Sequence, residues 1–335
     1  MKAVKVILTL ILVLIVVVGV LGLIAPKKYQ VERSMAINAP AAIVFRHVQY
    51  WKNWRDWSPW AAMDTTMTVI IEGKDGEVGS MYKWTGKKVG SGQMTATAVT
   101  PPTALEYQLR FIKPWAMTSD GYVKLSEDQG VTTATWAMLG KSPFPMNVFG
   151  LFVSMDKMVG KDFEKGMAKL KDLCEKDMAA AAKYEVKVTN FPARNYLAIR
   201  STVTMDQMGA FFPESMMKIM GVLGKKGIRM AGAPCGIYYT WDEGTMSSDM
   251  AVAVPVAGKP VLEGLSLISL PAAKAYTVDY YGPYDQSMAA YTAFDAYFAK
   301  NNLKTKMPMI EEYLTDTQKE KDQAKWLTRI TFFAE

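Results

Sequence analysis

The chain has 335 residues, of which 50% are hydrophobic and 21% charged, and its formal net charge is +7. This length and apolar content suit two folded domains with sizeable cores and exclude a globally disordered chain. The positive charge is spread out without a run of five Lys or Arg residues, so it does not indicate nucleic-acid binding, and weak attraction to anionic lipid headgroups is the expected consequence.

Histidine and cysteine are scarce, which limits the possible catalytic and metal sites. His47 is the single histidine, so a multi-histidine zinc site is excluded, and a Ser-His-Asp triad would need His47 itself. Its place near the end of a short predicted helix favours a structural role. Cys174 and Cys235 lie far apart, without the spacing of a metal motif or a disulfide framework. We therefore expect no metal and no cofactor.

Residues 6–25 form an uncharged, apolar stretch near the N-terminus. As a helix, this stretch would span about 30 Å, the thickness of the hydrocarbon core of a bilayer. A cleaved signal peptide is the alternative, but its apolar region is normally shorter, and cleavage after Ala25 would leave Pro26 at the start of the mature chain. We predict a single-pass membrane anchor over residues 1–28. Lysines lie on both sides of it, so the positive-inside rule leaves the orientation open.

Residues 29–182 predict a domain in which antiparallel strands pack on helices. The alternating segment 29–38 suits a strand, and Pro40 opens a short helix. Tryptophan then recurs at every third position from Trp51 to Trp60. Strand-like runs separated by turn-forming residues follow at about 67–73, 78–86, 91–99, 104–113, 116–126 and 130–140. Apolar residues at intervals of three and four predict a long amphipathic helix over about 153–182, which completes an α+β plan.

This first domain resembles the START-like polyketide cyclase/dehydrase superfamily. The resemblance rests on the segment from Ile37 to Phe45, on the tryptophan-rich segment 51–60 and on the closing helix. It implies a helix-grip fold, in which a curved sheet wraps around the long helix and encloses an apolar cavity for a small molecule or lipid. Some members are enzymes. The tryptophans could pack as a lid over the sheet or contact a ligand directly, and no arrangement of acids, bases and nucleophiles indicates a reaction.

Residues 184–335 show the same order of elements twice. The first pass has a strand over 184–202, broken at residues 191–193, a helix over about 205–225, and strands at 236–241 and 249–256. The second pass follows Leu270-Pro271-Ala272, with strands at 275–281, 310–315 and 326–333 and a helix at about 284–301. Corresponding pieces are offset by about 74 to 79 residues. We therefore predict a duplicated β-α-β-β domain with a cleft between its halves.

This duplicated domain resembles the GyrI-like, or AraC-type effector-binding, domain. The resemblance rests on segments 281–284, 311–316 and 327–333 and covers essentially all of 184–335. In that family, an acidic residue in a Glu-x-Tyr pattern reaches an aromatic central pocket. Glu311 and Tyr313 fit this pattern, so the resemblance implies that Glu311 binds the ligand. The family's regulators carry a DNA-binding helix-turn-helix ahead of this domain. A membrane segment and a cavity domain precede it here, so we expect no nucleic-acid partner.

The expected sheet geometry separates the two adjacent acids. Strand alternation places Glu311 and Tyr313 on one face and Glu312 on the other, and a one-residue register error would exchange the acids. We therefore expect Glu311 in the pocket and Glu312 in solvent. A carboxylate attracts an organic cation by charge, and aromatic faces attract it by cation–π interaction. The aromatic candidates, for which ordinary core packing is the alternative, are Tyr238, Tyr239, Trp241, Tyr281 and Tyr284.

The combined expectation is a membrane-anchored protein that binds a small apolar or amphipathic molecule, cationic ones included, rather than an enzyme. One alternative is a hydrolase or cyclase acting on an apolar small molecule, with Glu311 as general acid or base at a pKa tuned toward the working pH. Another is a sensor in which the ligand gates an interaction with a partner protein. The sequence contains no P-loop, dinucleotide fingerprint, His-Glu-x-x-His or Gly-x-Ser-x-Gly motif.

Overall fold

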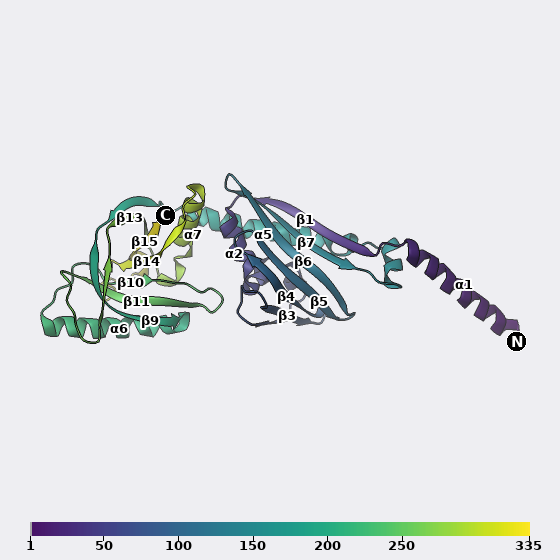
Figure 1. Ribbon diagram of the computed structural model, residues 1–335, viewed down its shortest axis with the longest axis horizontal. Helices are drawn as coiled ribbons and strands as arrows, with labels where there is room; N and C mark the ends of the chain where they lie inside the picture. The colour runs from purple at the N-terminus through teal and green to yellow at the C-terminus, as the bar shows by residue number, and fades with distance from the viewer. Residues whose placement is uncertain (1) are drawn as a thin grey trace. The chain divides into compact units, whose positions relative to one another are not determined.

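The computed structural model describes residues 2–335, which divide into two compact units at residues 174 and 175. Each unit contains one antiparallel sheet (Figure 1). The apolar helix α1 (Lys2–Ile24) precedes the sheet of the first unit. The predicted α+β class, with an N-terminal apolar helix and two sheet domains, is confirmed.

The first unit is built on a seven-stranded sheet with the order β1-β7-β6-β5-β4-β3-β2. Its strands are β1 (Lys28–Ile37), β2 (Thr68–Glu72), β3 (Met81–Gly86), β4 (Gly90–Thr100), β5 (Ala104–Lys113), β6 (Met117–Asp128) and β7 (Val131–Lys141). Its helical elements are α2 (Ala41–Gln49), η1 (Trp51–Asn53), α3 (Trp54–Trp57), α4 (Pro59–Met63), η2 (Met146–Leu151) and the long α5 (Met155–Ala181). The buried residues of α5 recur at the intervals of three and four that the sequence predicts.

Aromatic rings fill the interior of the first unit. Trp51, Trp54 and Trp57 are fully buried, and Trp136 of β7 stacks on Phe163 of α5 with ring centroids 4.1 Å apart. Each of the four indole N–H groups donates a hydrogen bond within the protein. The acceptors are the Ser80 hydroxyl for Trp51, the Val48 carbonyl for Trp54, the His47 carbonyl for Trp57 and the Tyr107 hydroxyl for Trp136. The tryptophans therefore form a packed core whose polar atoms are satisfied.

The second unit is built on an eight-stranded sheet with the order β12-β9-β11-β10-β14-β15-β13-β8. Its strands are β8 (Lys187–Phe191), β9 (Arg194–Thr204), β10 (Cys235–Tyr238), β11 (Ser247–Val256), β12 (Ser266–Leu270), β13 (Ala273–Tyr281), β14 (Thr305–Tyr313) and β15 (Leu327–Ala334). Its helical elements are α6 (Met205–Lys226), η3 (Tyr284–Gln286), α7 (Met288–Lys300) and η4 (Gln323–Lys325).

The two long helices of the second unit cover the same face of its sheet. Ile219 and Leu223 of α6 pack in one hydrophobic cluster, Phe294 and Phe298 of α7 pack in another, and Tyr238 of β10 contacts both clusters. Local signals set the ends of α6. The Gln207 side chain accepts a hydrogen bond from the backbone N–H of Thr204, and Gly227 ends the helix with a φ of +66°.

The strand order shows how the two repeats join. Central strands β10 and β14, one from each repeat, pair with each other. The leading strand of each repeat pairs with a strand of the other repeat. Strand β8 of the first repeat pairs with β13 of the second, and β12 of the second pairs with β9 of the first. The repeats therefore share one continuous sheet.

Candidate functional site

Glu311 lies at the centre of the second unit's sheet, on the face that the helices cover. Its Cα is opposite Gly236 of β10 and Ile330 of β15. Glycine at position 236 gives the neighbouring ring room, because a Cβ there would lie 2.7 Å from a ring carbon of Tyr238. The Tyr238 ring can therefore turn back along β10 toward the Glu311 carboxylate.

Three tyrosine hydroxyls donate hydrogen bonds to the Glu311 carboxylate. Tyr238 and Tyr313 reach Oε2 at 3.0 and 2.9 Å, and Tyr291 of α7 reaches Oε1. The hydroxyls of Tyr238 and Tyr313 also lie 3.2 Å from each other. We call Glu311 and these three residues the tyrosine cage. The cage gathers two strands and one helix around one acidic side chain.

The surroundings of the cage keep its hydroxyls protonated. Burial raises the pKa of Tyr238, Tyr291 and Tyr313 well above the usual value for tyrosine, and the nearby negative charge of Glu311 raises it further. Each hydroxyl therefore remains a donor at neutral pH, which stabilises a carboxylate that the sheet and helices partly remove from water.

Further aromatic rings extend from the cage to the protein surface. Phe212 of α6 and Tyr284 lie edge-on to Tyr313, with ring centroids 4.9 and 5.2 Å away. Trp326 lies against Tyr284 at 5.1 Å. Tyr284 is 44% exposed. We call Phe212, Tyr284 and Trp326 the aromatic rim.

The structure brings together only part of the predicted site. Tyr238 and Tyr313 contact Glu311, and Tyr284 contacts Tyr313. The grouping of Tyr239 with these residues is wrong, because strand alternation directs its ring to the opposite sheet face, where the Arg200 guanidinium lies 3.6 Å from the ring centroid.

Trp241 and Tyr281 are also placed outside this arrangement. Strand β10 ends at Tyr238, so Trp241 lies beyond the sheet, is exposed and donates to the Glu243 carboxylate. Tyr281 is the exposed last residue of β13. The ligand-binding roles of the predicted residues stay predictions.

The expectation that Glu312 is solvated is wrong. Its carboxylate forms a 2.6 Å ion pair with Arg194, and its side chain is largely buried, as is the nearby ring of Tyr196. The pair lies on the sheet face opposite Glu311, as alternation requires. Arg194 is distant in the chain, so the local pattern around Glu312 could not indicate the partner.

Three contributors to the cage and rim were not among the predicted residues: Tyr291, Phe212 and Trp326. A signal for Tyr291 exists, because it follows Tyr284 by seven residues, a spacing that returns to the same face of a helix. Phe212 and Trp326 carry no comparable signal, since they reach the site through the packing of α6 and of the segment before β15.

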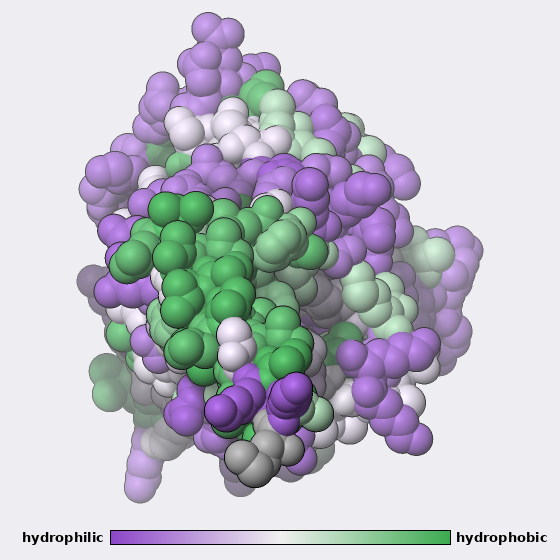
Figure 2. All heavy atoms as spheres, turned by 90° about the vertical axis from the view of Figure 1, so that its right-hand side faces the viewer, coloured by the Kyte–Doolittle hydropathy of each residue, from purple (hydrophilic) through white to green (hydrophobic). Residues whose placement is uncertain are grey.

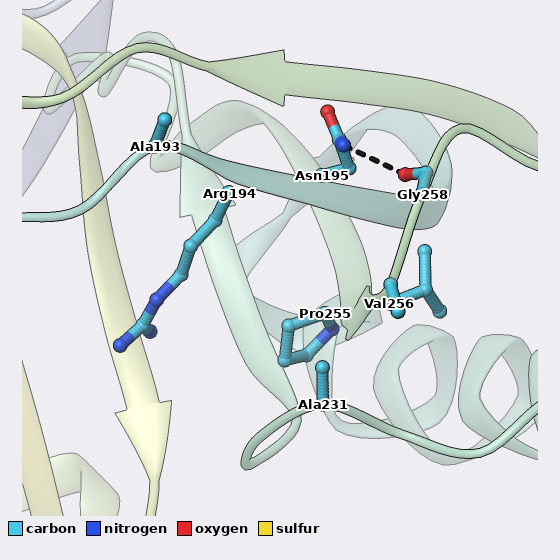
Figure 3. Close-up of a pocket in the computed structure, with 8 residues that line it drawn as sticks. Ala193, Arg194, Asn195, Ala231, Pro255, Val256 and Gly258 are labelled. Carbon is cyan, nitrogen blue, oxygen red and sulfur yellow. Dashed lines mark hydrogen bonds between the residues drawn. The ribbon is translucent and has the colours of Figure 1, made fainter.

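A surface hollow of the second unit lies away from the cage. It is bordered by residues 193–195 and 255–258, and Asn195 donates a 2.7 Å hydrogen bond to the Gly258 carbonyl across it. Figure 3 shows Arg194 extending away from the Asn195 side chain, and its guanidinium is the one paired with Glu312. The Glu311 carboxylate, held by three hydroxyl donors beside the aromatic rim, is the stronger candidate for ligand chemistry.

Comparison with protein families identifies both parts of the chain. Residues 28–175 match the polyketide cyclase/dehydrase and lipid transport family, and residues 184–332 match the GyrI-like small molecule binding domain. Both matches are to families of small-molecule-binding or cyclase-like domains. A comparison with curated proteins found no match.

Several solved structures align with about half of the chain. The crystal structure of the EcmrR C-terminal domain aligns at 21% identity and a TM-score of 0.42, covering 45% of this chain and 98% of that one. The cryo-EM structure of an EcmrR–DNA complex aligns at 18% identity and 0.41, covering 56% and 80%. The solution structure of the Aha1 dimer from Colwellia psychrerythraea aligns at 18% identity and 0.32, covering 44% and 96%.

Proposed function

Since the chain combines a START-like domain with a GyrI-like small-molecule-binding domain, we propose that it is a membrane-anchored protein that binds an amphipathic organic cation at Glu311. The observation that carries the proposal is the tyrosine cage, in which three hydroxyls hold one carboxylate and from which the aromatic rim extends to the surface. The proposal concerns the second unit, because tryptophan rings occupy the interior of the first.

The chemistry of the cage favours a ligand that offers charge and apolar surface. The three hydroxyls already use much of the hydrogen-bonding capacity of the carboxylate. A ligand rich in N–H donors would therefore compete with the tyrosines. A delocalised or quaternary cation needs no such donors, and it gains from the aromatic faces as well as from the negative charge.

The aromatic rim gives a ligand a route from the surface toward Glu311 and an apolar surface to contact. Tyr284 is partly exposed, while Tyr313 lies between it and Glu311. A flat or multi-ring cation could stack against Tyr284 and Trp326 with its charge directed toward the carboxylate. Such a ligand would be lipophilic, which suits a binding domain held at a membrane.

Membrane anchoring is supported by the length and composition of α1. The helix has 23 residues, its charged side chains are Lys2 and Lys5 near its start, and nearly all of it lies outside the protein core. Its length of about 34 Å is enough to cross a bilayer. We expect the full chain to resist extraction by alkaline carbonate. Release into the soluble fraction, or a mature N-terminus at residue 26, would support a signal peptide instead.

The binding proposal is tested with the full chain in phosphatidylcholine nanodiscs and tetraphenylphosphonium as the probe. Calorimetry with empty discs corrects for partition of the probe into lipid. Glu311→Gln should weaken binding about 10- to 100-fold, which corresponds to about 1–3 kcal/mol for a lost charge-assisted contact.

Glu312→Gln is the matched control, because Glu312 has the same side chain on the opposite sheet face. It should leave the affinity unchanged, and neutral triphenylphosphine oxide should bind weakly to both variants. Equal affinities of the Glu311→Gln and wild-type proteins would refute the role of Glu311. Conversion of an electrophilic test compound by wild-type protein but not by Glu311→Gln would favour the hydrolase alternative.

A further inference from the structure

An unusual run of exposed apolar side chains follows the last strand of the first unit's sheet. Phe149 is 67% exposed and Phe152 71% exposed, and Phe144, Met146 and Val153 are exposed as well. Single exposed apolar residues are common on soluble proteins, but a contiguous group of this size marks an interaction surface. We call residues 144–153 the apolar segment.

The apolar segment is fixed to the C-terminal end of α1. The Asn147 side chain donates a 2.7 Å hydrogen bond to the Gly22 carbonyl. The Phe144 ring packs so closely on Gly22 that a Cβ there would lie 2.4 Å from a ring carbon. Ala25, just beyond the helix, is buried. If α1 crosses a bilayer, these contacts hold the apolar segment at the depth where the helix leaves it.

A second exposed aromatic group lies at the same end of the sheet. Lys28 of β1 pairs with Lys141 of β7, and β6 begins and β5 ends at that level of the sheet. The β5–β6 turn therefore projects from the end of the sheet that α1 adjoins (Figure 1). Its Trp115 is 77% exposed, beside exposed Ile112. Tryptophan favours the interface between lipid and water, because its ring is apolar and its N–H needs a polar partner.

Positive charge surrounds these apolar groups. Exposed lysines occur at positions 27, 28, 113, 141 and 157. Arg33 forms 2.7 Å ion pairs with both Asp156 and Glu164 near this end, and Asp120 is the acidic residue on the adjoining part of β6. Figure 2 views this end of the molecule, and the hydrophobic band in its foreground is formed largely by α1, which projects from this end in Figure 1. Lysines at this position match the anionic headgroups of a membrane surface.

From these observations we propose that the α1-proximal end of the first unit is a membrane-docking face. The apolar segment and the β5–β6 turn insert side chains into the interfacial layer of the same bilayer that α1 crosses, while the lysines contact headgroups. The inference rests on the proposed membrane anchoring. It adds that the first unit lies directly on the lipid, so that the connection after α1 does not act as a flexible tether.

The test places a reporter on the apolar segment of the full chain. A Phe149→Cys variant carries the polarity-sensitive dye NBD and is reconstituted into vesicles of phosphatidylcholine and phosphatidylglycerol. Native Cys174 and Cys235 are buried and should not compete for the dye. Val78→Cys is the matched control, because Val78 is 62% exposed but lies in the β2–β3 turn, whereas the β5–β6 turn is level with the other end of β3. The dye at position 149 should emit at shorter wavelength and be quenched by shallow spin-labelled lipids, whereas the dye at position 78 should report water.

Flotation of the same vesicles separates the two proposals. If the protein floats but the dye at position 149 reports water, the docking face is refuted, whereas the membrane anchoring by α1 is still supported. A partner protein would then be the better candidate to cover the apolar segment. If the protein does not float, the anchor is refuted and the docking face with it. Phe149→Ser combined with Phe152→Ser should keep flotation and reduce quenching of a dye at position 115, introduced as Trp115→Cys. Unchanged quenching in that variant would also contradict the proposal.

Discussion

The interior of the first unit and the tyrosine cage of the second are both aromatic, yet they are built for different purposes. In the first unit, each of four buried indole N–H groups meets a neutral acceptor, and the rings pack against one another. In the cage, three tyrosine hydroxyls meet one carboxylate, and the adjoining rings reach the surface. Neutral, closed packing favours stability. A partly buried charge with an aromatic approach favours recognition.

Removing a ring from the closed core should have the largest effect. Trp136→Ala deletes a buried ring that stacks on Phe163, and should lower the free energy of unfolding of the first unit by about 3–5 kcal/mol. Hydrogen exchange measured on peptides of each unit reports the two stabilities separately. Trp136→Phe, which keeps a ring but loses the hydrogen bond to Tyr107, should cost less. Equal losses in the two variants would contradict a core held by ring packing.

Alkaline pH should have the next largest effect on stability, through the hydroxyls of the tyrosine cage. The folded-state pKa of each cage hydroxyl lies above the unfolded value of about 10. The associated stability is therefore complete below pH 10 and is lost as pH rises through the folded pKa values. At pH 11 the loss is at most about 1.4 kcal/mol for each hydroxyl, or about 4 kcal/mol for three. Exchange rates of peptides from β10, β14 and α7 should rise between pH 10 and 11 after correction for the intrinsic rate.

Removing one cage hydroxyl should have an intermediate effect. Tyr313→Phe keeps the ring contacts with Phe212 and Tyr284 but removes one donor to Glu311, and should destabilise the second unit by about 1.5–3 kcal/mol. The variant should also lose less stability at alkaline pH than the wild type. A variant as stable as the wild type would mean that the hydroxyl contributes nothing to holding the carboxylate.

The ion pair behind the cage should matter least. Glu312→Gln keeps the shape of the side chain but removes its charge beside Arg194, whose side chain is 34% exposed. Solvent screening of this partly exposed partner limits the expected loss to about 1 kcal/mol. If Glu312→Gln lowers the stability as much as Tyr313→Phe does, the ion pair on one sheet face contributes as much stability as a cage hydrogen bond on the other.

Much of the architecture follows from local sequence patterns, and so does the central acid of the site. Hydrophobic periodicity indicates α5 and α6, and alternation along β14 places Glu311 and Tyr313 together on one face and Glu312 on the other. The partners of both acids do not follow from such local patterns. Tyr291 reaches Glu311 from α7, and Arg194 reaches Glu312 from β9, so these contacts depend on how distant segments pack.

The misplaced aromatic residues have a related cause. The sequence indicates a strand through residue 241, but β10 ends at Tyr238. A strand that ends three residues early leaves Trp241 outside the sheet. Tyr239 faces away because it is adjacent to Tyr238, which already occupies the helix-covered face. Composition identified the right kind of residue, and only the geometry separates the residues near Glu311 from the others.

The exchange of leading strands between the two repeats makes each repeat dependent on the other for folding. Because β8 completes the second repeat and β12 completes the first, a fragment holding one repeat would leave a sheet edge unpaired. Residues 257–264 between the repeats are mostly exposed and belong to no strand or helix. Cleavage of the chain there should yield two pieces that are insoluble alone but regain the native sheet when mixed, as complementing fragments do.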